Sequence, residues 1–70
     1  MKNRIRALRK AKNLRQEDLS DILGVTRQTI NAIENDKYDP TLSLAFGLAK
    51  VLGTTVDELF FYGNDNTGGE

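Results

Sequence analysis

Four polar side chains lie close together in the chain and have the chemistry to recognise a nucleic acid. They are Arg27, Gln28, Thr29 and Asn31. A Gln amide can bond adenine bidentately, and an Arg guanidinium can bond guanine bidentately or hold a phosphate. For Arg27 the sequence does not choose between these two contacts. Side chains of this kind reach base edges when a helix carries them into a major groove, which requires a helix at these residues.

Residues 16–35 predict two short amphipathic helices joined by a turn. Each helix has two apolar residues one helical turn apart, which can bury a stripe against a common core. These residues are Leu19 and Leu23 in the first helix and Ile30 and Ile33 in the second. Gly24 can adopt the left-handed conformation that ends the first helix, Val25 can enter the core, and Thr26 can cap the second helix with its hydroxyl. The pattern predicts a helix-turn-helix, a DNA-binding motif.

The whole chain predicts five helices and no strand. The expected ranges are about 2–11, 16–23, 27–34 and 42–52, with a short last helix that begins after Thr55. Asn13 tolerates the left-handed backbone that would end the first helix, and Gly53 would end the fourth. Thr41 can cap the fourth helix, and Thr55 with Glu58 has the spacing of a capping box. The expected fold class is therefore all-α.

In sequence the chain resembles the lambda-repressor-like helix-turn-helix regulators of the Cro/C1, or Xre, type. The similarity extends from Arg4 to about Phe61 and includes the stretches GVTRQTINAIEN and YDPTLSLAFGLAKVLG. A helix-turn-helix spacing alone is a moderate signal, but a match over five predicted helices in order is strong. The resemblance implies a compact five-helix lambda-repressor-like DNA-binding domain at residues 1–62. It also implies a regulator of transcription, with repression expected, whose partner is double-stranded DNA.

The resemblance further implies roles for individual residues. Gln28 matches a position near the start of the recognition helix that reads a base. Gln16, at the start of the preceding helix, can reach a phosphate or brace a base contact, unless it is simply solvated. Asn35 and Lys37 match a loop that grips the sugar-phosphate backbone, although both could be ordinary turn residues. The expected DNA-binding residues are Arg15, Gln16, Thr26, Arg27, Gln28, Thr29, Asn31, Asn35 and Lys37.

Two residues depart from the family pattern. Arg15 stands where the family usually has Ser, Thr or Asn to cap the second helix, so we expect that cap to be missing. A cation at a helix N-terminus is unfavourable unless a DNA phosphate neutralises it, which suggests that Arg15 takes part in binding. Asp36 stands where Gly is common. An Asp accepts the turn less easily and brings a negative charge close to Lys37.

Two further expectations concern the interior of the motif. Ser20 lies where the second helix passes close to the third, so a small side chain is required there. The resemblance implies that Arg9 of the first helix pairs with Glu34 at the end of the third; the alternative is two surface charges. Periodicity supports the pair, because Arg9 neighbours Ile5 and Leu8 on the inner side of its helix, where an unpaired charge would be costly.

Charge is distributed unevenly along the 70-residue chain, although the formal net charge is zero. Residues 1–37 contain nine basic and five acidic residues, a balance of +4, and residues 38–70 contain one and five, a balance of −4. Seven of the ten basic residues lie within the first fifteen positions. In isolation this is typical of a solvated basic helix, but beside a recognition helix it favours a surface that faces phosphates.

Composition argues against several other classes of protein. The chain has no His and no Cys, and it has no Gly-rich phosphate loop, so we expect no enzyme, no metal and no cofactor. A small-molecule ligand is not indicated. No apolar run approaches the length of a membrane span and the N-terminus is not signal-like, so we expect a cytoplasmic protein. The polar tail at residues 63–70 has nothing to pack and is expected to be disordered.

The C-terminal half has more apolar surface than one face of a small core requires. This surface lies on the helix expected at 42–52 and at Phe60, Phe61 and Tyr62. It could cover the core or form a homodimer contact, and the sequence leaves both open. A two-fold dimer would set two recognition helices about 34 Å apart, so its operator would be an inverted repeat. The alternative function is an antitoxin-like module, or another protein-binding module on the same fold.

Overall fold

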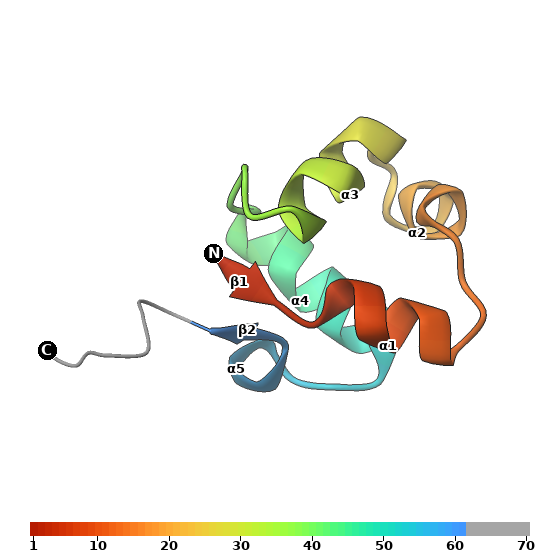
Figure 1. The fold of residues 1–70 in the computed structure, drawn as a ribbon. Coiled ribbons are helices and arrows are strands. Elements are labelled where there is room, and N and C mark those ends of the chain that lie inside the picture. Colours follow the sequence, from red (N-terminus) through yellow and green to blue (C-terminus); the bar gives the residue numbers. More distant parts are fainter. Residues whose placement is uncertain (62–70) are drawn as a thin grey trace, which may run out of the picture.

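The computed structural model describes residues 1–61, and this part of the chain folds into five helices (Figure 1). The helices surround one apolar core. The helices are α1 (Ile5–Ala11), α2 (Gln16–Leu23), α3 (Arg27–Glu34), α4 (Leu42–Leu52) and α5 (Val56–Leu59). The expectation of an all-α, five-helix domain is confirmed. The expected disordered tail at 63–70 lies outside the described residues, as does Tyr62.

Two very short strands join the ends of the described chain. β1 (Lys2–Asn3) pairs antiparallel with β2 (Phe60–Phe61), and the Arg4 amide continues the pairing by donating to the Leu59 carbonyl at 2.9 Å. The expectation of no strand is therefore wrong, and α1 begins at Ile5 rather than near Lys2. Strands of two residues carry no detectable alternation, and their pairing depends on a contact between distant parts of the chain.

Threonine hydroxyls begin three of the helices. Thr26, Thr41 and Thr55 each precede a helix, and each accepts a hydrogen bond from the backbone amide three residues later. These caps confirm the three predicted helix starts. The capping box at α5 is only half formed, because the Glu58 carboxylate accepts from the Thr54 hydroxyl at 3.2 Å.

Left-handed residues end the helices at the predicted positions. Gly24 (φ 72°) follows α2, Gly53 (φ 73°) follows α4, and Asn13 (φ 59°) follows α1. Asp36 (φ 62°) takes the same conformation after α3 without being glycine. The amide of Lys37 closes that end by donating to the Ala32 carbonyl at 2.9 Å, which is the bond of a Schellman motif.

The core draws on all five helices and on β2. Its buried apolar residues are Ile5, Leu19, Ile30, Ile33, Ala45, Leu48, Ala49, Leu52, Leu59 and Phe60. Of the apolar residues predicted to form the core of the motif, Leu23 and Val25 are only partly buried and pack against this cluster. Ser20 is buried, as its small side chain led us to expect.

Neither a membrane span nor a metal site is found in residues 1–61. No helix there is both long and apolar enough to cross a bilayer. No group of three or more His, Cys, Asp or Glu side chains in the same residues is placed to hold a metal ion.

Candidate nucleic-acid interface

The start of α2 and the outer face of α3 together form a shallow hollow on the surface. Gln16, Arg27, Gln28 and Asn31 line this hollow, whose volume is about 270 Å³. Arg27, Gln28 and Asn31 are exposed, whereas Ile30 and Ile33 on the other side of α3 are buried. The structure therefore brings four of the nine predicted site residues to one place, where three are exposed and Gln16 is half-buried.

Gln16 is anchored rather than freely solvated. Its Nε2 donates to Glu34 Oε1 at 3.1 Å, and its side chain is half-buried between α2 and the end of α3. Gln16 thus has a defined position at the edge of the hollow. A fixed amide at the start of a helix is suited to bracing a neighbouring contact, because its conformational entropy is already lost.

Thr26 and Thr29 contact each other at the start of α3. Their hydroxyl oxygens lie 3.0 Å apart, and Thr26 Oγ1 also accepts from the Thr29 amide at 3.1 Å. The Thr26 hydroxyl is therefore already engaged as a helix cap. Arg27 and Gln28, which follow it directly, make no side-chain hydrogen bond to any residue within 1–61.

Asn35 connects the exposed polar face of α3 to α1. Its Nδ2 donates to the Asn31 carbonyl at 2.8 Å and to Asn31 Oδ1 at 3.2 Å, and its Oδ1 accepts from Arg6 Nη2 at 3.0 Å. Lys37, two residues further on, is exposed. Asn35 is therefore a fixed residue of the helix end, while the Lys37 ammonium is accessible.

A nearly buried ion pair lies behind this face. Arg9 donates from Nε to Glu34 Oε2 at 2.7 Å and from Nη2 to Glu34 Oε1 at 3.2 Å, which confirms the expected pair. The Glu34 side chain is 0% exposed. Burial raises the pKa of Glu34, but hydrogen bonds from Arg9, Gln16 and Arg6 outweigh it, so the pKa lies below its ordinary value. The carboxylate is therefore held ionised at the C-terminal end of α3.

Arg15 at the start of α2 gives no side-chain cap, as predicted. A guanidinium has no acceptor, so it cannot bind the free amides of the helix. Asp18 supplies the reciprocal half of a capping box, because its Oδ2 accepts from the Arg15 amide at 2.8 Å and lies 3.6 Å from Arg15 Nε. The bond from the Arg15 amide is the largest cause of the lowered pKa of Asp18. The start of α2 is thus held by the Asp18 carboxylate although Arg15 gives no cap.

Arg6 belongs to the basic N-terminal stretch that was expected to face phosphates, but it was not among the named site residues. Its guanidinium donates to both Glu34 and Asn35, from one turn before Arg9 on α1. The spacing of three residues from Arg9 was a usable signal, because residues three apart share a helix face.

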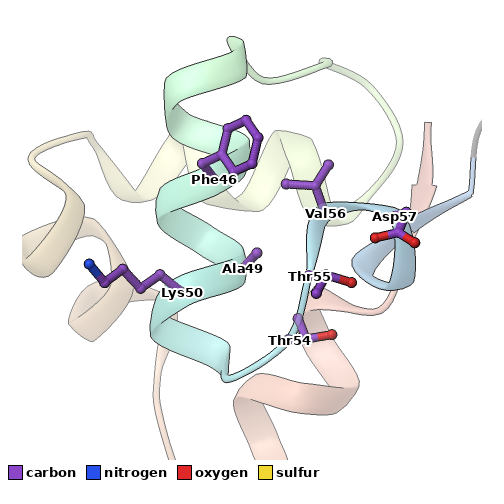
Figure 2. Close-up of a pocket in the computed structure, with 7 residues that line it drawn as sticks. All are labelled: Phe46, Ala49, Lys50, Thr54, Thr55, Val56 and Asp57. Carbon is purple, nitrogen blue, oxygen red and sulfur yellow. The ribbon is translucent and has the colours of Figure 1, made fainter.

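The opposite end of the molecule has an apolar groove of about 600 Å³ between α4 and α5 (Figure 2). Phe46 and Val56 point toward each other across it, with Lys50 on the α4 side and Asp57 on the α5 side. Phe46 is 59% exposed. Phe60 belongs to the buried core, so of the two Phe residues expected at a dimer contact only Phe61 keeps an exposed face.

Comparison with known proteins finds similarity over most of the chain. A helix-turn-helix family model matches residues 5–59. An uncharacterized HTH-type transcriptional regulator of Methanocaldococcus jannaschii is 52% identical over 65 residues, which cover 93% of this chain and 98% of that one.

Two solved structures share the fold. The restriction-modification controller protein C.AhdI from Aeromonas hydrophila matches with a TM-score of 0.73 at 35% identity, covering 81% of this chain and 86% of that one. The DNA-binding domain of the P22 C2 repressor matches with a TM-score of 0.72 at 33% identity, covering 77% of this chain and 71% of that one.

Proposed function

Because this chain belongs to the helix-turn-helix family of Cro/C1-type DNA-binding transcriptional regulators, we propose that it is a sequence-specific repressor that inserts α3 into the major groove. The members of this family regulate transcription and are not enzymes. The observation that carries the proposal is the division of α3, whose polar residues line an accessible hollow while its apolar residues are buried. The similar P22 C2 protein is named as a repressor, which supports this direction of control.

Base recognition is assigned to polar residues of α3. Gln28 reads a base through its amide, with Asn31 and Thr29 further along the same helix as additional contacts. Arg27 contacts either a guanine or a phosphate beside it. Gln16, held by Glu34, braces these contacts from the start of α2.

Phosphate contacts are assigned to the residues around α3. Arg15 and Lys37 carry exposed cations on either side of the recognition face and bind the DNA backbone. Thr26 and Asn35 act mainly by holding the two ends of α3, since their polar groups are already engaged within the protein. The left-handed backbone of Asp36 ends α3. Its negative charge reduces the attraction between Lys37 and a phosphate.

The protein acts as a homodimer whose contact is the groove between α4 and α5. Phe46 lines this groove and is exposed, and Leu42 is exposed one helical turn before it on α4. Adjacent exposed apolar side chains form a patch, and such patches favour a partner. Lys50 and Asp57 border opposite sides, so a two-fold related copy can pair each with the other. The same groove favours a second candidate, an antitoxin-like module in which another protein covers it.

The proposal is tested by selecting binding sites from a random duplex DNA pool at near-physiological salt. We expect enrichment of an inverted repeat whose half-sites lie about one turn of DNA apart, roughly 10 base pairs. Failure of the folded, pure protein to enrich any sequence overturns DNA recognition. If the chain alone is a monomer and forms a complex only with a different, co-purified protein, the antitoxin-like candidate is favoured.

A further inference from the structure

We propose that Arg6 of α1 binds a DNA phosphate at the edge of the recognition surface, an inference that rests on the DNA-binding function proposed above. Arg6 lies outside the helix-turn-helix segment, yet its guanidinium reaches the end of α3. Its Nη2 donates to Asn35 Oδ1 at 3.0 Å, and its Nε lies 3.4 Å from Glu34 Oε1.

A line of hydrogen bonds connects Arg6 to the recognition face. Arg6 donates to Asn35, and Asn35 donates to Asn31 Oδ1 at 3.2 Å. Asn31 and Asn35 are four residues apart, so they share one side of α3. Arg6 therefore continues the polar side of α3 beyond the point where the helix ends.

At the end of α3 two positive charges, those of Arg6 and Arg9, face the one negative charge of Glu34. This excess of positive charge leaves Arg6 available to an anion. Arg9 and Arg6 share the single carboxylate of Glu34, and Arg9 has the short contact of 2.7 Å. The Arg6 contact is longer, and its side chain is 52% exposed. Within residues 1–61 its two bonds leave other guanidinium N–H groups unpaired. A guanidinium that is held in place and incompletely neutralised matches the geometry of a phosphate oxygen pair.

Arg6 could instead serve only to hold the end of α3, where a cation is favourable. The two roles differ in their salt dependence, because only a phosphate contact releases counterions from DNA. We would therefore measure the Kd of the parent, Arg6→Gln and Arg6→Lys for the selected duplex between about 50 and 200 mM salt. Arg4→Gln is the matched control, because it removes the same charge from a guanidinium that lies 5.3 Å from the Phe61 ring centre, beside β2.

Arg6→Gln should reduce the salt slope by about 0.9 for each phosphate that is no longer bound and weaken binding roughly fivefold per phosphate near 0.15 M salt. For a dimer with two such phosphates the affinity falls about thirtyfold. Arg6→Lys should keep most of the slope, and Arg4→Gln should keep all of it. The melting temperature of Arg6→Gln should change by no more than about 3 °C, because the Arg6 side chain is exposed and Glu34 keeps its closer contact with Arg9.

Three results overturn the role of Arg6. The first is an unchanged affinity and slope in Arg6→Gln, and the second is a loss of affinity without a change in slope, which marks a structural role. The third is an equal loss of salt slope in Arg6→Lys and Arg6→Gln, since the charge then does not matter. All three results require that the parent protein enriches a sequence in the binding-site selection. If the parent enriches none, the proposed DNA-binding function is itself wrong. The failure of the proposed function is thereby distinguished from the failure of the role of Arg6.

Discussion

Arg9 joins α1 to two other parts of the motif at once, through a 2.7 Å contact from its Nε to Glu34 Oε2. Its Nη1 donates to the Leu14 carbonyl at 3.0 Å, in the segment that leads into α2. One nearly buried guanidinium therefore sets the end of α3 and the approach to α2 relative to α1. The orientation of α3, the proposed recognition helix, depends on this pair, although neither residue is placed in contact with DNA.

Removing one partner of this pair should destabilise the domain strongly. In Glu34→Ala the Arg9 charge stays buried without its carboxylate, and we expect the free energy of unfolding to fall by about 3 kcal/mol. The double variant Arg9→Met/Glu34→Leu removes both charges and should lose less than the single variant. Urea denaturation of the single and the double variant measures these losses in the free energy of unfolding. A loss under about 0.5 kcal/mol in Glu34→Ala, the range of ordinary surface substitutions, means that the pair is not structural.

Stability should fall in acid because the folded state lowers the pKa of Glu34 from its ordinary value of 4.5. A lowered pKa contributes stability above the unfolded value, and this contribution is lost as the pH falls through the folded value. We expect a nearly constant free energy of unfolding from about pH 7 to 5 and a decline below. Glu34→Gln should decline less steeply. Asp18→Asn is the control, because Asp18 is the other carboxylate whose pKa is lowered. If the free energy of unfolding of the parent and of Glu34→Gln falls in parallel with pH, the role of Glu34 is refuted.

Phe46 should contribute to dimerisation and not to the fold of one chain. We expect Phe46→Ser to keep its melting temperature at low protein concentration and to weaken the dimer by about 2 kcal/mol or more, because it removes a large apolar contact. Ile22→Ser is the matched control, since Ile22 is also 59% exposed but lies on α2. Analytical ultracentrifugation over a concentration series measures the difference. A monomeric parent, or equal weakening by Ile22→Ser, rules out this contact.

Lys37 should strengthen binding to all DNA sequences alike. In Lys37→Gln we expect the affinities for the selected duplex and a scrambled duplex to fall by the same factor, with the salt slope reduced by about 1 for each phosphate that is no longer bound. Lys12→Gln removes a lysine whose side chain lies beside Gly53 at the end of α4, and it should leave both affinities unchanged. If only the selected duplex is affected, Lys37 reads sequence instead.

Local signals were sufficient to predict most of the helices. The ranges expected at 16–23, 27–34 and 42–52 match α2, α3 and α4, because apolar spacing, Thr caps and left-handed Gly residues all operate within a few positions of the chain. The first helix was extended too far, since Lys2 and Asn3 pair with Phe61 and Phe60. That pairing spans almost the whole domain and leaves no local pattern.

The sequence was enough to predict which residues of α3 share a surface, but not the hydrogen bonds that join this surface to other helices. Residues on one face of a helix follow from the period of 3.6, so the grouping of Arg27, Gln28 and Asn31 could be anticipated. The bond from Gln16 to Glu34 and the reach of Arg6 to Asn35 join different helices. They depend on how three helices pack, which the spacing along one helix does not contain.

The central claim is that α3 reads bases, and Gln28 tests it most directly. Gln28 is exposed, so Gln28→Ala should fold with unchanged stability. We would select binding sites for Gln28→Ala and for the parent side by side, and measure both affinities on the parent site. We predict that base preference disappears at one or two positions in each half-site, with a loss of about 1 to 3 kcal/mol on the parent site. An identical selected sequence, bound equally tightly by both proteins, would contradict the claim that this face of α3 enters the groove.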